Sequence, residues 1–318
     1  MENSTTAREF ILLGLTNNHQ FAIGLFLILL VIYFLTLIGN MLIIIITLVN
    51  AQLYSPMYFF LRHMAWIEIG YVSTIIPKTL ANMATGRKSI SLAGCFTQMF
   101  LYFFLGTTEF LLLATMSVDR YIAICNPLHY PTIMNEQICS LLVLCCLAGG
   151  LSLILVPAIL LFQMPFCGPH NIINHFFCDN GPLIKLSCVD TGLLELIDFV
   201  IAIFSLLGTL IINVVSYIKI ISTILRIPST TGRKKTFSTC ASHMSVISIT
   251  YSSCIFMYIR PRSSSKLDFN KITALLNIVM APLLIPFIYC LKNKQVQEAL
   301  RAELRRWFFS ETKLFIGE

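Results

Sequence analysis

The chain has 318 residues, of which 57% are hydrophobic and 12% are charged, and its mean hydropathy is +0.81. A soluble domain of this composition would expose large apolar patches, so these values exclude a soluble globular protein. The formal net charge of +7 lies mainly in residues 226–235 and after Lys292, where attraction to anionic lipid accounts for it without nucleic acid as a partner.

Seven segments are long enough to cross a membrane, because a bilayer core of about 30 Å needs roughly 20 helical residues. Segments 21–50, 138–164, 237–259 and 272–291 contain no Asp, Glu, Lys or Arg, whereas 57–84, 95–125 and 193–225 contain a few. The sequence therefore predicts an all-α membrane protein with a seven-transmembrane helix bundle over residues 21–292.

The orientation follows from an odd number of spans, which places the two termini on opposite faces. Asn3 begins the sequon Asn-Ser-Thr, which is glycosylated only outside the cytoplasm. An outside N-terminus also puts 13 Lys and Arg residues on the cytoplasmic side and 9 on the other. We therefore expect an extracellular segment at residues 1–20 and a cytoplasmic tail at 293–318.

The tail has the pattern of an amphipathic helix lying on the inner leaflet. Its apolar positions are Val296, Leu300, Leu304, Trp307 and Phe308, and its basic positions are Lys294, Arg301 and Arg305. A frayed basic tail is the alternative.

Four cysteines fall on the predicted outer face: Cys95 at the start of the third span, and Cys167, Cys178 and Cys188 in the long loop that follows the fourth. In an oxidising compartment they allow three pairings into two disulfides. A zinc site formed by Cys167, His170, His175 and Cys178 is the alternative, but it would leave two free thiols outside the cell.

Two pairs of charged residues in the spans need an explanation. Asp119 and Arg120 lie 24 residues or more beyond Cys95, about 36 Å along a helix, and hence at the cytoplasmic boundary. Either they form an activation switch, or they are a charge pair at the membrane interface with no switching role. Glu68 and Glu109 reach the middle of the bilayer at matching depth, so we expect them to share a proton or to bind a cation.

The outer half of the bundle contains a candidate ligand pocket. Helical spacing places residues of the third, fifth and sixth spans on inward faces, although packing between helices would give the same pattern. Because residues 95–108 contain no Asp or Glu, we expect a small, largely apolar and neutral ligand. The lining residues are Met99, Tyr102, Phe103, Gly106, Thr107, Ile201, Ser205, Tyr251, Cys254, Ile255 and Tyr258.

A series of motifs in this order resembles the odorant (olfactory) receptors of the rhodopsin-like G protein-coupled class. The motifs are GN at 39–40, SPMYFFL at 55–61, IIPKTLANM at 75–83, DRYIAICNPLHYPTIM at 119–134, HFFCD at 175–179, SY at 216–217, KKTFSTCASH at 234–243 and PFIYCLKN at 286–293. The resemblance implies an odorant receptor of the olfactory cilia, without enzymatic activity or a cofactor, that raises cyclic AMP through a stimulatory G protein.

The resemblance also implies roles for individual residues. It implies the disulfides Cys95–Cys178 and Cys167–Cys188, and sodium between Glu68 and Glu109 with Asn40 nearby. It implies that Asp119 restrains Arg120, which is released on activation toward Tyr217, Tyr289 and the G protein. Ile285 departs from the pattern, because the family usually has Asn before Pro286. Independently of the resemblance, each proline within a span removes a helix hydrogen bond and is a candidate hinge, although a kink without function is the alternative. These prolines are Pro77, Pro157, Pro282 and Pro286.

Two other functions compete with this interpretation. A receptor for a non-odorant small molecule outside the olfactory epithelium would carry the same motifs. A transporter would need a continuous polar route, but beyond Glu68 and Glu109 the spans offer almost none.

Overall fold

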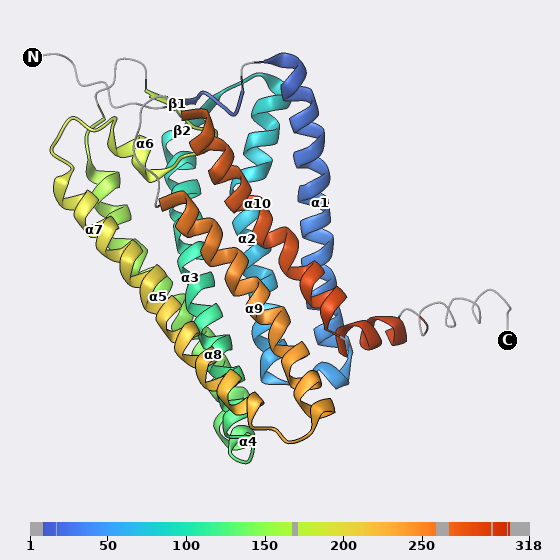
Figure 1. The fold of residues 1–318 in the computed structure, drawn as a ribbon. Helices are drawn as coiled ribbons and strands as arrows, with labels where there is room; N and C mark the ends of the chain where they lie inside the picture. Colours follow the sequence, from blue (N-terminus) through green and yellow to red (C-terminus); the bar gives the residue numbers. More distant parts are fainter. Residues whose placement is uncertain are drawn as a thin grey trace, which may run out of the picture.

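The computed structural model describes residues 9–16, 18–166, 171–258, 267–293, 295–303 and 305. Within these ranges the chain forms a bundle of long helices that run between two ends, with the N-terminal segment at one end and the C-terminal helix at the other (Figure 1). The predicted glycosylation site Asn3 and the half-cystine Cys167 lie outside the described residues.

Seven long helical segments occur in the described part of the chain, as predicted. They are α1 (His19–Val49), α2 (Pro56–Thr85), α3 (Leu92–Cys125), α5 (Glu136–Gln163), the continuous segment of α7 (Gly192–Ile203), the π-helical turn η2 (Phe204–Gly208) and α8 (Thr209–Leu225), then α9 (Thr230–Tyr258) and α10 (Leu267–Lys292). The short helices η1 (Ala51–Leu53), α4 (Tyr130–Ile133) and α6 (Asn180–Ile184) lie in the connections.

Among the described residues, five of these segments are individually long and apolar enough to cross a membrane: α1, α3, α5, α7 through α8, and α10. Helices α2 and α9 contain more polar residues, several of which are buried inside the bundle, such as Glu68 on α2 and His243 on α9. Some of these polar side chains bond to other helices, as His243 does to Tyr217 of α8, so a bundle of seven helices remains compatible with a bilayer.

Local sequence determines where the helices begin and end. Asn18, Ser91 and Asn135 accept hydrogen bonds from free backbone N–H groups in the first turns of α1, α3 and α5. Pro56 occupies the first turn of α2, where no N–H partner is needed, and Gly86 ends that helix with a φ of 70°.

A small sheet covers one end of the bundle, and hydropathy did not predict it. Strand β1 (Glu9–Leu12) pairs antiparallel with β2 (Ser89–Ser91) and parallel with β3 (Ile172–Ile173), in the order β2-β1-β3. Phe10 and Leu12 on β1 are fully buried against the ends of the helices. The segment before the first span is therefore partly a structural cap and not only a polar tail.

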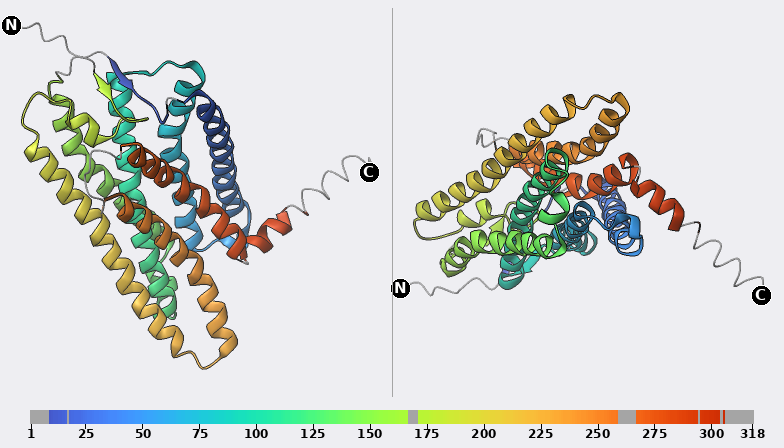
Figure 2. Two further views of the ribbon diagram at one scale, coloured as in Figure 1. Left: turned by 45° about the horizontal axis from the view of Figure 1, so that its top comes forward. Right: turned by 90° about the horizontal axis from the view of Figure 1, so that it is seen from below.

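The C-terminal segment is helical over residues 295–303 and turns away from the bundle axis (Figure 2). Val296 and Ala299 are buried in the core, whereas Arg301 and Arg305 are exposed. The helix is therefore two-sided as predicted, but its apolar side here packs against the bundle. The predicted positions Lys294, Leu304, Trp307 and Phe308 lie outside the described residues.

Two glycines allow helices to approach closely. A Cβ atom at Gly39 of α1 would lie 3.0 Å from the ring of Pro286 on α10, and one at Gly150 of α5 would overlap the Thr108 side chain of α3. These contacts fix α1 against α10 and α5 against α3.

Candidate functional site

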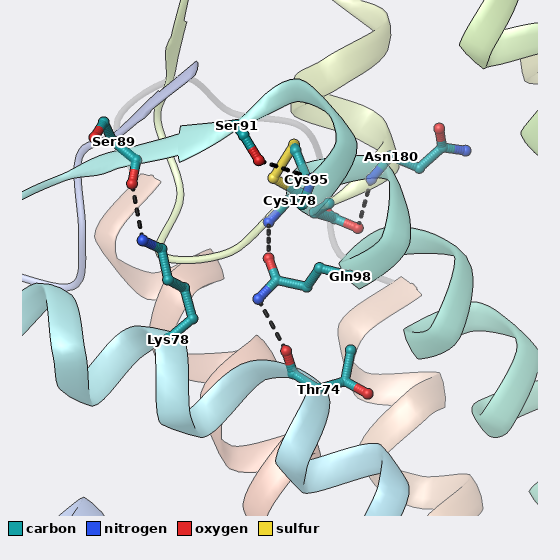
Figure 3. Close-up of a disulfide and its surroundings, with 10 residues drawn as sticks. Thr74, Lys78, Ser89, Ser91, Cys95, Gln98, Cys178 and Asn180 are labelled. Carbon is teal, nitrogen blue, oxygen red and sulfur yellow. Dashed lines mark hydrogen bonds between the residues drawn. A yellow bond between two sulfur atoms is a disulfide. The ribbon is translucent and has the colours of Figure 1, made fainter. Parts of the chain in front are cut away.

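A disulfide joins Cys95 at the start of α3 to Cys178 in the loop before α6. Gln98, one turn further along α3, reinforces this connection: its Oε1 accepts the N–H of Cys178 at 3.0 Å, and its Nε2 donates to the carbonyl of Thr74 on α2 at 3.0 Å (Figure 3). The bond excludes Cys178 as a zinc ligand. Cys188 is also disulfide-bonded, while its predicted partner Cys167 lies outside the described residues.

The loop beside this disulfide fills the same end of the bundle with aromatic side chains. His175 stacks on Phe176 with 4.8 Å between ring centroids, and Phe177 lies 5.1 Å from the ring of Tyr102. Burial, and then the nearby Lys271 ammonium, lower the pKa of His175 to about 3. The imidazole is therefore neutral at physiological pH and acts as an apolar packing group.

The candidate ligand residues on α3 face the interior at different depths. Met99 packs beneath the sheet, while Tyr102 stacks on Tyr71 of α2 with ring centroids 5.0 Å apart. Gly106 lies one turn below Tyr102, and a Cβ there would meet the Tyr71 ring at 3.4 Å. Thr107 is buried and Phe103 is half-buried.

Two of the candidate residues on the fifth and sixth spans form polar contacts within the bundle. Ser205, in the π-helical turn, donates to the carbonyl of Ile201 at 2.7 Å. Cys254 is buried and lies 3.6 Å from Oδ1 of Asn277 on α10, while Ile255 is half-buried against the core. The side chain of Tyr258 lies outside the described part of the chain.

Tyr251 is the centre of a buried polar network that the sequence did not indicate. Its hydroxyl donates to Thr209 Oγ1 at 2.6 Å and accepts from Asn213 Nδ2 at 2.9 Å, both on α8. Asn213 Oδ1 accepts in turn from the hydroxyl of Ser117 on α3. The network ties α9 to α8 and α8 to α3 in the middle of the bundle.

Glu68 and Glu109 are both buried, and their carboxylates lie within electrostatic range of each other. The structure thus brings together the two residues that helix depth had placed at one level. Glu109 Oε1 accepts from Thr250 Oγ1 of α9 at 3.5 Å, whereas neither oxygen of Glu68 has a hydrogen-bond partner among the described residues.

Asp119 and Arg120 form an ion pair near the C-terminal end of α3. Nε and Nη2 of Arg120 donate to Asp119 Oδ2 at 3.0 and 2.6 Å. A third residue, Tyr130 of α4, donates to the other carboxylate oxygen at 2.8 Å. Burial, and then the Asp119 charge, raise the pKa of Tyr130, which keeps the phenol protonated as a donor.

The other residues implied for coupling lie around this pair but are not bound to it. The hydroxyl of Tyr217 on α8 shares a hydrogen bond of 2.6 Å with Nδ1 of His243 on α9. The Tyr289 hydroxyl is buried without a partner among the described residues, and Ile285, one turn earlier on α10, is buried in the core. The structure therefore shows Arg120 held by Asp119, with both tyrosines separate from it.

Comparison with known proteins identifies the family to which a chain with these features belongs. The sequence model of a protein family described as Olfactory receptor matches residues 29–306. The chain is 57% identical to Olfactory receptor 6E1 of Mus musculus over 98% of this chain and 100% of the relative. It is 49% identical to human Olfactory receptor 6C75 over 98% and 100%, and 51% identical to human Olfactory receptor 6C4 over 96% and 99%.

The chain belongs to the olfactory receptor family. It is an odorant receptor of the G protein-coupled class and not an enzyme, and the apolar helices are its membrane-spanning part. For this olfactory receptor, the Asp119–Arg120 pair marks the end opposite the disulfide and the small sheet.

Proposed function

We propose that the odorant binds in the outer half of the bundle, below the Cys95–Cys178 disulfide, and that it is small, largely apolar and neutral. Two features support this position: the described lining of α3 and α9 carries few polar groups, and the Tyr251 hydroxyl at its lower limit is already occupied by Thr209 and Asn213. The proposed lining is the set predicted from sequence, with Tyr258 near the entrance.

The polar network below this pocket is the observation that supports a signalling mechanism. A ligand that shifts Tyr251 would disturb its bonds to α8, and Asn213 would carry that change to Ser117 on α3. Ser117 lies only two residues before Asp119 on the same helix, so displacement of α3 there would act on the ion pair that holds Arg120. Release of Arg120 would then open the inner end to the G protein.

We further propose that the partner is the stimulatory, olfactory type of heterotrimeric G protein, which raises cyclic AMP. The N-terminus is extracellular and the C-terminus cytoplasmic, in the plasma membrane of olfactory cilia. The excess of Lys and Arg on the side that holds Arg120 supports this orientation. The extracellular segment 1–20 carries a glycan at Asn3, and a second disulfide joins Cys167 to Cys188.

A sodium ion is proposed as an allosteric modulator between Glu68 and Glu109. The residues fit a cation, because both Glu68 oxygens and the Oδ1 atom of Asn40 are buried without partners among the described residues. No group of three His, Cys, Asp or Glu side chains able to hold a metal occurs in the described part of the chain, so the two carboxylates and the Asn40 oxygen would be the protein ligands. The bound ion would neutralise carboxylates that are costly in a bilayer.

Thermal unfolding of the purified receptor tests the sodium proposal without a signalling readout. We expect a higher melting temperature in sodium chloride than in choline chloride for the native chain, and no difference when both carboxylates are replaced, in Glu68→Gln/Glu109→Gln. Equal sodium dependence of the two proteins would contradict the proposed site.

A cyclic AMP reporter in cells tests the pocket, with a panel of neutral odorants as ligands. For an agonist found in that screen, Tyr258→Phe should weaken the response by about tenfold if its hydroxyl bonds the ligand. Gly106→Leu should block it, because the new side chain would fill the space beside Tyr71. Gly24→Leu is the matched control, since nothing lies within 4 Å of that position. Unchanged dose-response curves for both pocket variants at equal surface expression would place the pocket elsewhere.

A further inference from the structure

A cleft lies between the inner ends of α8 and α9, at the opposite end of the bundle from the disulfide. It has a volume of about 430 Å³, and its lining residues are Ile221, Ile224, Leu225, Arg233, Lys234 and Phe237. In Figure 2 these two helices reach the end of the molecule opposite the N-terminus and are joined there by a short turn. The cleft therefore lies where two spans leave the membrane.

The cleft opens on the lipid-facing side of the bundle. Leu225 and Phe237 are 64% and 52% exposed, and Ile221 is 37% exposed. Ile221 and Leu225 continue a stripe of exposed apolar residues at helical spacing on α8, which includes Ile211 and Ile218. Because that stripe faces hydrocarbon, an acyl chain can enter the cleft directly from the bilayer.

The rim of the cleft is positively charged and has no acidic neighbour along the chain. Residues 199–267 contain no Asp or Glu, whereas residues 219–235 contain five Lys and Arg. Arg233 donates from Nη2 to the carbonyl of Ile227 at 3.1 Å, which holds the guanidinium at the rim, while its buried Nε has no hydrogen-bond partner among the described residues. A donor that is buried and unpaired requires an acceptor.

We propose that this cleft binds one anionic phospholipid of the inner leaflet, with its phosphate on Arg233 and Lys234 and an acyl chain on Ile221, Leu225 and Phe237. An apolar groove at the membrane boundary with basic residues at its rim is the arrangement that anionic headgroups recognise between transmembrane helices. Since the walls come from both α8 and α9, a bound lipid would link the inner ends of these two helices. The assignment to the inner leaflet rests on the proposed orientation.

Native mass spectrometry of the full-length receptor in detergent, titrated with phosphatidylserine, tests the proposal independently of that orientation, because a detergent micelle has no leaflets. We expect one retained phosphatidylserine on the native chain, and weaker retention of phosphatidylcholine with the same acyl chains. For Arg233→Gln/Lys234→Gln the affinity for phosphatidylserine should fall roughly thirtyfold. The soluble headgroup glycerophosphoserine should not displace the lipid, since it lacks the acyl chains.

The matched control is Arg301→Gln/Arg305→Gln, which removes two exposed cations from the C-terminal helix at the same end of the molecule. Retained binding in this control supports a local site, whereas an equal loss in both double variants would overturn it in favour of diffuse attraction. Unchanged binding in Arg233→Gln/Lys234→Gln would also overturn it. If that variant kept its lipid but lost cyclic AMP signalling, the surface would belong to the G protein and the lipid proposal would be wrong.

Discussion

Substitution of Tyr130 by Phe should raise the activity of the receptor without ligand. The phenol donates a hydrogen bond of 2.8 Å to Asp119, whose other oxygen holds Arg120. A hydrogen bond to a charged group contributes about 1.5–3 kcal/mol. Loss of the lower value changes the ratio of held to released arrangements by about tenfold, so basal signalling should rise by about that factor while the held arrangement still predominates.

The measurement is ligand-free cyclic AMP in cells, divided by the amount of receptor labelled at the surface. Tyr121→Phe provides the control, because it removes a hydroxyl from a neighbouring tyrosine that is 38% exposed. Basal cyclic AMP that stays the same in Tyr130→Phe, or rises equally in both variants, would refute the argument that Tyr130 restrains Arg120 through Asp119.

Three further outcomes follow from the geometry. Arg120→Ala should abolish agonist-driven cyclic AMP with measurable surface expression, and a retained response would show that the ion pair has no switching role. Gly150→Ala should lower the melting temperature and surface expression, because its new methyl group overlaps the Thr108 side chain, while Gly24→Ala should change neither. Burial lowers the pKa of His175 from an ordinary 6.5 to about 3, so below about pH 6.5 the unfolded chain binds a proton that the folded chain does not, and folding stability falls. At pH 5 this loss of stability is about 2 kcal/mol. In thermal unfolding, the melting temperature of His175→Phe should therefore fall less than that of the native chain between pH 7 and pH 5.

Helix number and position could be predicted from the sequence because a bilayer imposes a simple condition on each span. A run of about 20 residues with few charges satisfies it wherever the rest of the chain lies. The depth of Glu68 and Glu109 follows in the same way, since helical rise converts residue number into distance. These predictions need no knowledge of how the helices pack together.

Other features depend on contacts between distant parts of the chain, and the sequence could not indicate them. Phe10 packs against the end of the bundle because strand β1 pairs with the strands at 89–91 and 172–173. No local sequence pattern specifies the register of these strand pairs. Similarly, Asn213 looks like any polar residue in a span, and only the tertiary structure shows that it joins Tyr251 to Ser117. A polar residue on an otherwise apolar helix was a usable signal, but it does not identify the partner.

The buried polar groups around Tyr251 and those around Glu68 differ in how completely they are paired. On the side of α3, α8 and α9, the network around Tyr251 is bonded at each of the atoms described above. On the side of α1, α2 and α10, oxygens of Asn40, Glu68 and Tyr289 are buried without partners among the described residues. Ile285 lies on α10 between Pro282, whose carbonyl binds Asn40, and Tyr289, and its apolar side chain cannot bond to any of them. Unpaired polar atoms cost free energy in a membrane interior, so this second region is where binding of a proton or a cation would stabilise the bundle most.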